Sequence, residues 1–342
     1  METADGRRHF GWCSLGVWTL CASLGWAGEV FRFPTANHAL FEPNGDAAFL
    51  APTPGRTWES GSFGCVRTDK GGPRLHEGLD IKSLTKDARG EPSDPVLSSA
   101  SGTVAYLNRH PGASNYGNYA LVRHYVERME VYTLYAHLSS ILPKLATGAK
   151  LEAGDRLGTM GRTGQPIGKD RAHVHFEINL VVNDRFTEWF RRHYPDERND
   201  HGNFHGKNLL GIDPRGVLME QRARGGEFSL ARFVASQPVM ARVAVRNPQL
   251  RFANRYPQFV RPNPRAEREG VAGYELGLNF NGIPVEIIPR SAQELAGVSG
   301  HKLLSVNESE WRAHPCGRLV IRRGQAWTLT GHGDELVDLI AF

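Results

Sequence analysis

The stretch His173-Val-His-Phe-Glu-Ile-Asn179 decides the fold, because its polar and apolar residues alternate one by one. In a β-strand, this alternation buries the three apolar residues and presents the two histidines, Glu177 and Asn179 on one polar face. Short runs of β-branched and aromatic residues recur upstream between turn signals, at 103–107, 119–126 and 130–138. This rhythm predicts a mainly β protein built on a compact antiparallel sheet or barrel-sandwich.

The run 130–138 carries a second candidate face. Its alternation places His137 on the same face as Thr133 and Tyr135, with apolar residues on the opposite face. We therefore expect the two strands to direct their histidines into a shared groove. Between them, the glycines of 148–155 and 161–164 are predicted to serve tight turns.

Three separated pieces of the chain carry metal-ligand chemistry. His76 and Asp80 are four residues apart, and His175 lies in the stretch quoted above. Two imidazoles and a carboxylate suit one zinc ion with a fourth position open for water, which is typical of catalytic rather than structural zinc sites. His137 and His173 are then free for proton transfer.

Five motifs follow one another in a fixed order. They are His76-x-x-x-Asp80, Asn115-Tyr-Gly-Asn-Tyr119, Tyr135-Ala-His137-Leu, the Gly-Asp and Gly-x-Thr-Gly turns, and His173-x-His175-Phe-Glu177. This series resembles the lysostaphin or LytM family of zinc metallopeptidases. The resemblance covers 57–215 and implies the duplicated hybrid motif, an antiparallel β fold with a narrow groove.

The resemblance also implies roles and a substrate. It makes His76, Asp80 and His175 the ligands of one Zn²⁺ ion, and His137 and His173 the catalytic residues. Members of this family cut peptide cross-links in bacterial peptidoglycan. The implied partner is therefore the peptide stem of peptidoglycan.

Two segments depart from the family pattern. Family members commonly have Ser-Thr-Gly-Pro before the paired histidines, whereas this chain has Ile167-Gly-Lys-Asp-Arg-Ala172. Because that loop borders the groove, its difference bears on substrate preference more than on the metal site. An insertion after Asn183 is expected to flank the groove, and its aromatic residues either form a wall for substrate or pack against the barrel.

Several neighbouring residues have open roles. Glu177 either orients a ligand histidine or forms a salt bridge. Asn118 and Tyr119 are expected to serve a hairpin. A basic groove rim of Arg162, Lys169 and Arg171 would suit carboxylate-rich peptide stems, although loop charges are usually solvated.

Composition divides the chain into five predicted segments. They are a signal peptide at 1–27, an N-terminal extension at 28–56, the peptidase domain at 57–215, an irregular linker at 216–270 and a small β-rich domain at 271–342. The role of the last segment is left open.

The N-terminal residues predict export. Arg7 and Arg8 precede an uncharged run from 10 to 26, and Ala27 supplies a small residue for cleavage. The alternative is a retained membrane anchor, for which the run is short. The mature chain is thus expected in the periplasm, the cell envelope or outside the cell, without a stable membrane span.

The chain has four cysteines, which the predicted segments divide into two pairs. Cys13 and Cys21 lie in the predicted leader, which leaves Cys65 and Cys316. These two lie in different predicted domains, which favours two separate buried thiols. A disulfide is the alternative, because disulfides persist outside the cytoplasm.

The sequence predicts an exported zinc metalloendopeptidase that hydrolyses peptidoglycan cross-links. One alternative is a non-catalytic member that binds and activates a cell-wall amidase, and another is a structural zinc protein of the envelope. All five positions of the site are filled, which favours catalysis. The net charge of +5 is modest and comes without dense basic blocks, so no nucleic-acid partner is expected.

Overall fold

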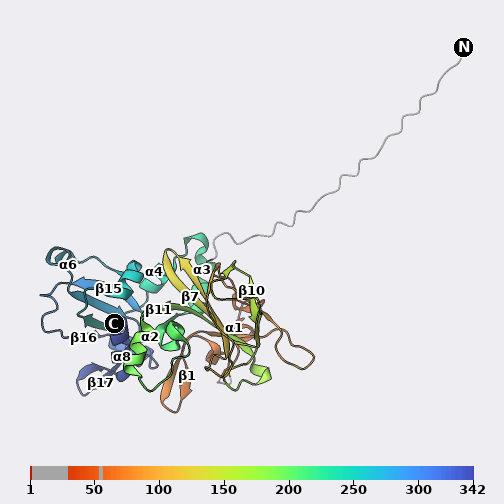
Figure 1. Ribbon diagram of the computed structural model, residues 1–342, viewed down its shortest axis with the longest axis horizontal. Helices are drawn as coiled ribbons and strands as arrows, with labels where there is room; N and C mark the ends of the chain where they lie inside the picture. Colours follow the sequence, from red (N-terminus) through yellow and green to blue (C-terminus); the bar gives the residue numbers. More distant parts are fainter. Residues whose placement is uncertain (2–29, 54–56) are drawn as a thin grey trace.

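The computed structural model describes residues 1, 30–53 and 57–342 (Figure 1). The predicted leader, apart from its first residue, and its two cysteines lie outside the described residues. In the described ranges, no helix has both the length and the apolar character that crossing a bilayer requires.

A seven-stranded antiparallel sheet forms the centre of the first half of the chain. Its strand order is β12-β11-β7-β6-β5-β9, with β3 also paired to β11. The strands are β3 (Leu79–Lys82), β5 (Gly102–Asn108), β6 (Asn118–Val126), β7 (Met129–Leu138), β9 (Lys150–Leu151), β11 (His173–Val181) and β12 (Leu209–Ile212). The four predicted runs therefore form β5, β6, β7 and β11, which confirms the mainly β fold class.

Smaller elements surround this sheet. Two short antiparallel sheets comprise β1 (Gly64–Asp69) with β2 (Gly72–His76), and β4 (Pro95–Leu97) with β10 (Arg156–Thr159) and β8 (Ser140–Ile141). The N-terminal segment contributes η1 (Ala39–Phe41) and α1 (Asp46–Phe49), and η2 (Trp58–Gly61) precedes β1. The N-terminal segment pairs with the sheet through an isolated antiparallel bridge between Leu50 and Ile81.

The two faces of the main sheet differ because side chains alternate along each strand. One face carries Val174, Phe176 and Ile178, which belong to the large hydrophobic core. Across the ladder, Phe176 pairs with Tyr135 and lies on this same face. The opposite face carries His175 and its cross-strand neighbours, and this face holds the candidate site.

Most of the segment 216–270 forms helices and a strand, so its prediction as irregular structure is wrong. Most of its residues belong to short elements joined by loops: α3 (Pro214–Arg224), η6 (Gly225–Glu227), α4 (Leu230–Ala235), β13 (Ala241–Val245), α5 (Arg251–Arg255), η7 (Pro257–Phe259) and α6 (Pro264–Glu269). Most of these elements have five or six residues, too few to show a helical or strand period in the sequence. Pro214, Pro257 and Pro264 each occupy a first helical turn, where proline is tolerated.

The C-terminal part is built on a four-stranded antiparallel sheet of order β15-β14-β13-β16. Its further elements are β14 (Gly273–Leu278), β15 (Pro284–Arg290), β16 (His301–Val306), α7 (Glu308–Ala313), the hairpin β17 (Val320–Arg323) and β18 (Ala326–Leu329), and α8 (Gly331–Ala341). The strands β14 to β18 give 271–342 the β-rich character that the sequence predicts. The central strand β13 comes from the segment expected to be a linker, and a separate domain at 271–342 stays a prediction.

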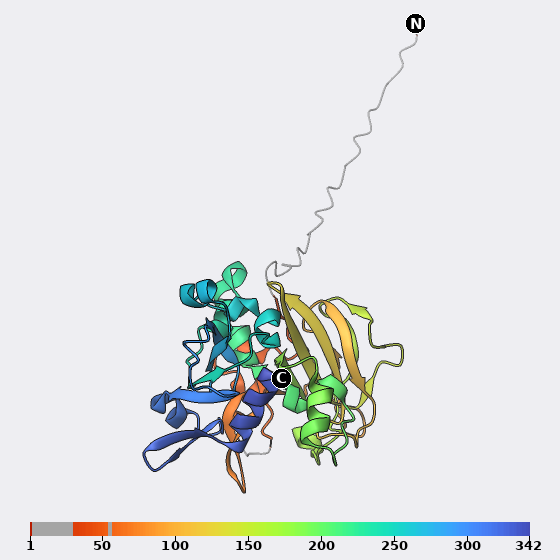
Figure 2. The ribbon, with the colours of Figure 1, turned by 60° about the vertical axis from the view of Figure 1, so that its left-hand side comes forward.

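The two sheet systems lie on opposite sides of the molecule (Figures 1 and 2). The insertion helix α2 (Phe186–His193) and α8 meet between them, where Trp189 Nε1 donates to Asp338 Oδ2 at 2.7 Å. Cys65 of β1 forms a disulfide with Cys316. The expectation of two separate thiols is wrong, because the C-terminal part packs directly against the β1–β2 hairpin.

Candidate metal centre

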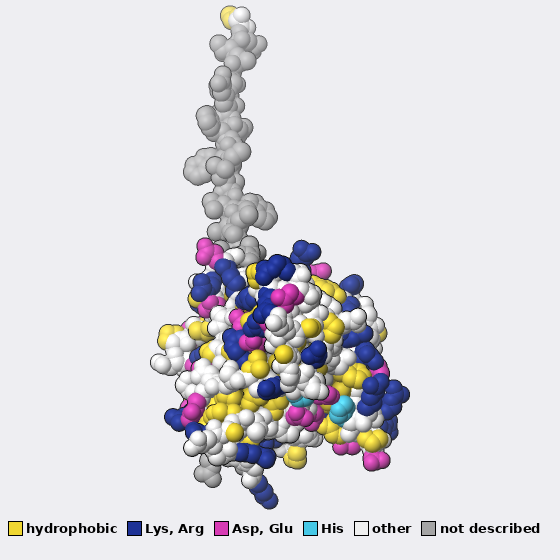
Figure 3. Space-filling view, turned by 90° about the vertical axis from the view of Figure 1, so that its left-hand side faces the viewer, with side chains coloured by type: hydrophobic (Ala, Val, Ile, Leu, Met, Phe, Trp, Pro, Cys, Tyr) yellow, Lys and Arg dark blue, Asp and Glu magenta, His cyan; other side chains and the backbone are white. Residues whose placement is uncertain are grey.

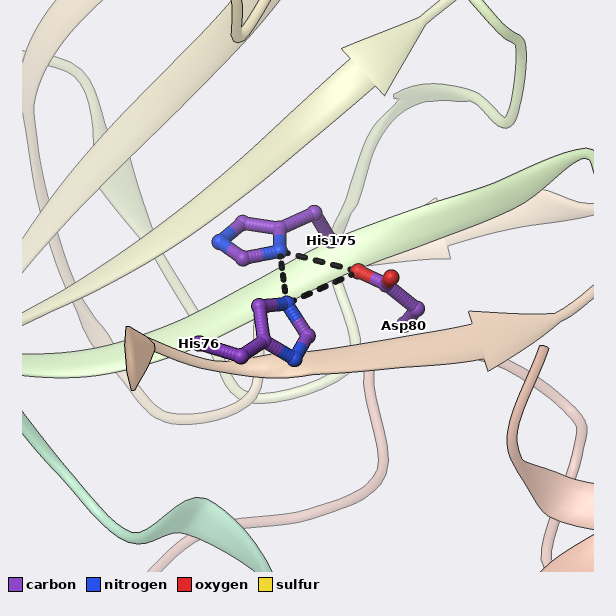
Figure 4. A group of neighbouring side chains, drawn as sticks. All are labelled: His76, Asp80 and His175. Carbon is purple, nitrogen blue, oxygen red and sulfur yellow. Dashed lines mark hydrogen bonds and ion pairs between the residues drawn. The ribbon is translucent and has the colours of Figure 1, made fainter. Parts of the chain in front are cut away.

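Three predicted ligands meet on the face of the main sheet that lies opposite the large hydrophobic core. His76 ends β2, Asp80 lies in β3, and His175 lies opposite Asp80 in the β3–β11 ladder. His175 Nδ1 lies 2.9 Å from Asp80 Oδ1 and 3.0 Å from His76 Nε2, and His76 Nε2 lies 3.2 Å from Asp80 Oδ1 (Figure 4). Strand pairing therefore brings together residues that are 99 positions apart.

The two other predicted histidines lie beside this group. His173 precedes His175 by two residues on the same face, and its Nε2 lies 3.4 Å from Asp80 Oδ1. The ring of His137 lies 4.9 Å from that of His173 and 6.0 Å from that of His175, measured between centroids. All five predicted side chains thus border one point.

His137 reaches the groove by a break in the strand rather than by alternation. Regular alternation would place it with Tyr135, which is buried in the core on the other face of the sheet. Instead, His137 has a φ of 61°, in the left-handed region that non-glycine residues seldom adopt, and the β6–β7 register shifts there. The expected position of His137 is confirmed, but the expected reason is wrong. Such backbone outliers concentrate at functional sites.

Each of the four histidines has one ring nitrogen fixed by an outer partner. The carbonyl oxygens of Ser62, Thr163 and Arg171 accept from Nδ1 of His76, His137 and His173, at 2.6, 2.8 and 2.7 Å. For His175, Glu177 Oε1 accepts the hydrogen bond from Nε2, at 2.7 Å. For His76, His137 and His173, the outer nitrogen donates to a carbonyl oxygen, so the hydrogen-bond pattern assigns the lone pair of the ring to the inner nitrogen. His175 differs, because both of its ring nitrogens face carboxylate oxygens.

Burial governs protonation in this cluster. It lowers the pKa of His76 to about 4 and that of His137 to about 3, and it also lowers the pKa of His173. Burial acts in the same direction on His175, but hydrogen bonds to Asp80 and Glu177 outweigh it and raise that pKa to about 9. His76, His137 and His173 are therefore neutral at pH 7, as a metal ligand or a general base must be.

Glu177 orients His175 within a buried network. Besides His175, its carboxylate accepts from the Tyr116 hydroxyl at 2.7 Å and from Asn179 Nδ2 at 2.7 Å. Although burial would raise the pKa of Glu177, these hydrogen bonds and the charge of His175 lower it. Both roles considered for Glu177 are thus combined, since its ion pair with His175 is also the contact that fixes the imidazole.

The groove around the site is lined by several separated segments. The loop that departs from the family pattern contributes Ile167 and Arg171, and the insertion contributes His201, His205 and Gly206. The aromatic residues of α2 instead pack in the core. The insertion thus flanks the groove as expected, and of the two alternatives for its aromatic residues those of α2 follow the packing one.

The predicted basic rim is only partly correct. Arg162 and Lys169 form ion pairs with Glu91 at 2.8 and 3.1 Å, so their charges are compensated, and only Arg171 of the three lines the groove. Arg67 and Arg74 of the β1–β2 hairpin also line it, and sequence patterns did not single them out. On the molecular face of Figure 3, basic and acidic side chains are interspersed, as the sequence composition predicts.

The donor set fits a small cation that prefers nitrogen and oxygen ligands. Among the described residues, His76, Asp80 and His175 form the one cluster whose ligand atoms all lie within 4.8 Å of one another. Their inner nitrogens and one carboxylate oxygen converge, while the outer nitrogens are fixed. Two imidazoles and a carboxylate are a typical ligand set of catalytic zinc.

Residues 74–186, about a third of the chain, match the model of peptidase family M23. The chain is 37% identical over 101 residues to the peptidoglycan DD-endopeptidase ShyA of Vibrio cholerae, covering 30% of this chain and 20% of ShyA. It is 37% identical over 112 residues to the cell division protein DipM of Caulobacter vibrioides, covering 33% of this chain and 16% of DipM. A solved structure of a putative glycyl-glycine endopeptidase lytM from Ruminococcus gnavus is 29% identical, covers 31% of this chain and 39% of that one, and has a TM-score of 0.24.

The chain matches about a fifth or less of the length of these two curated relatives. What is shared is the peptidase domain, which contains all five predicted site residues. The insertion beyond 186, the N-terminal segment and the C-terminal sheet lie outside the family match.

Proposed function

We propose that this protein is an exported zinc metalloendopeptidase that hydrolyses peptide cross-links of bacterial peptidoglycan. The observation that carries the proposal is the convergence of three ligand atoms beside two further anchored imidazoles. The M23 match and the similarity to a named peptidoglycan endopeptidase support it. Export rests on the leader predicted from the sequence.

In this proposal, His76, Asp80 and His175 hold the ion. Zinc bound there supplies Lewis acidity, which lowers the pKa of water and polarises a carbonyl group. His137 and His173 present neutral inner nitrogens to the same point, because burial keeps their pKa values low and backbone carbonyls hold their outer nitrogens. One accepts a proton from the attacking water, and the pair delivers a proton to the leaving amine.

The groove walls position the peptide. Tyr116, Ile167 and His205 come from three different segments and line the groove, so a bound peptide contacts the turn before β6, the variable loop and the insertion together. Fixing the scissile bond beside the site lowers the entropic part of the barrier. The insertion and the variable loop are therefore the segments expected to set which cross-link fits.

A chelator experiment tests the function. Purified protein incubated with isolated peptidoglycan is expected to release new free amines, to stop doing so after dialysis against a chelator, and to recover when zinc is restored. Mass spectrometry of the released muropeptides identifies the cleaved bond.

Other outcomes of the same assay support the competing functions. Binding to peptidoglycan without amine release at full zinc occupancy would favour a regulator that activates an amidase. Loss of the folded state on zinc removal, again without amine release, would favour a structural zinc site.

A further inference from the structure

The two carboxylate oxygens of Asp80 have separate sets of partners. Oδ1 faces the three imidazoles of the cluster, at 2.9 Å from His175, 3.2 Å from His76 and 3.4 Å from His173. Oδ2 instead accepts hydrogen bonds from the Thr53 hydroxyl and from Arg67 Nη2. Asp80 itself is 1% exposed, so protein groups rather than solvent satisfy both oxygens.

Thr53 comes from the N-terminal segment, outside the M23 match. That segment runs alongside β3 in space. Leu50 forms a β-bridge with Ile81, and the Ala51 amide donates to the Asp80 carbonyl at 2.8 Å. These backbone contacts place the Thr53 hydroxyl against the side chain of the same aspartate. The N-terminal segment is thereby part of the site's outer shell.

Arg67 lies in β1, also before residue 74. Its Nε donates to the Ser60 carbonyl at 3.0 Å, and its side chain is 21% exposed beside the groove. Nη2 also lies 2.9 Å from His76 Nε2. A metal ion bound to His76 Nε2 would displace the contact between Arg67 and His76. It would leave the contact of Arg67 with Asp80 Oδ2 intact, because the metal faces the other carboxylate oxygen, Oδ1.

We propose that Thr53 and Arg67 are positioning residues that fix the Asp80 carboxylate, so that Oδ1 alone is presented to the metal. The inference rests on the proposed function and extends it to two residues outside the family match. A carboxylate rotates over a broad torsional range when it is unrestrained. Two donors on Oδ2 remove that freedom before the metal binds, and outer partners of this kind typically contribute 10- to 100-fold in metal affinity or activity.

Thr53→Val tests the hydroxyl with little change in shape. We expect its zinc dissociation constant, measured by competition with a chromophoric chelator, to rise about 10-fold. Thr53→Ser, which keeps the hydroxyl, is expected to restore near-normal affinity. Thr147→Val is the matched control, since this exposed threonine lies away from the groove.

Arg67→Gln and Arg67→Lys test the cation. We expect Arg67→Gln to weaken zinc binding by at least as much as Thr53→Val, and Arg67→Lys to recover part of the loss because the ammonium keeps a charged donor. Thermal unfolding of the metal-free variants identifies any that do not fold. If an Arg67 variant does not fold, the comparison of Thr53→Val with Thr53→Ser still tests the proposal.

The outcomes separate this inference from the proposed function. Wild-type zinc affinity in Thr53→Val and Arg67→Gln, or equal loss in Thr53→Ser and Thr53→Val, would overturn the positioning roles. These measurements concern zinc binding alone, so they hold even if the wild-type protein binds zinc without cutting peptidoglycan. In that case the proposed function fails and the positioning roles stand.

Discussion

Replacing His173 with alanine is expected to reduce kcat on peptidoglycan by about 100- to 10,000-fold, the usual range for losing a general acid or base. His173 Nε2 borders the cluster, but the three ligand atoms do not require its ring. Zinc content should therefore stay near one ion per chain. Amine release under saturating substrate and metal analysis of the same sample measure both quantities.

His137 allows a sharper version of the same experiment. Asparagine tolerates a positive φ better than most residues, so His137→Asn should keep the backbone at 61° while removing the imidazole. A kcat loss of the same order is expected. His110→Ala is the matched control, because His110 is exposed and lies outside the groove. Wild-type kcat in both His173→Ala and His137→Asn would exclude these histidines from proton transfer.

The second large effect is loss of the metal itself. In His76→Ala, zinc content after dialysis is expected to fall from about one ion per chain to near zero, and amine release should fall with it. The reason is that two protein ligands cannot replace the three that converge here. Elemental analysis of dialysed protein gives the zinc content directly.

Asp80→Asn makes the same test by removing charge rather than volume. The amide keeps the shape of the side chain but removes the negative charge that faces three imidazoles and Arg67. Zinc content is again expected to fall, with the folded state checked by circular dichroism. A full zinc content in both His76→Ala and Asp80→Asn would place the ion elsewhere in the protein.

Much of the sheet was predictable because its strands are long. β6, β7 and β11 have nine or ten residues each, enough for alternation to appear in the sequence. β13 and the helices α4, α5 and α6 have only five or six residues, and tertiary packing defines them more than any local period does. The pairing of Cys65 with Cys316 depends on how the C-terminal part docks, which sequence spacing does not contain.

The order of the motifs predicted which residues form the site. It did not predict how the backbone and the neighbouring residues position them. The spacing of His76, Asp80 and His175 in recognised motifs led to the cluster that the structure brings together. The face of His137 depends on one left-handed residue in β7, which alternation alone assigns to the wrong side. Thr53 and Arg67 lie in no motif, and the structure identifies them by their contacts with Asp80.

The central claim is that one metal ion binds where His76, Asp80 and His175 meet. Anomalous X-ray diffraction at the zinc edge, on crystals of the zinc-loaded protein, tests it most directly. We predict a single strong peak about 2.0–2.2 Å from His76 Nε2, Asp80 Oδ1 and His175 Nδ1. A zinc-loaded crystal with no peak between these three atoms, or with its peak at another set of residues, would contradict the account.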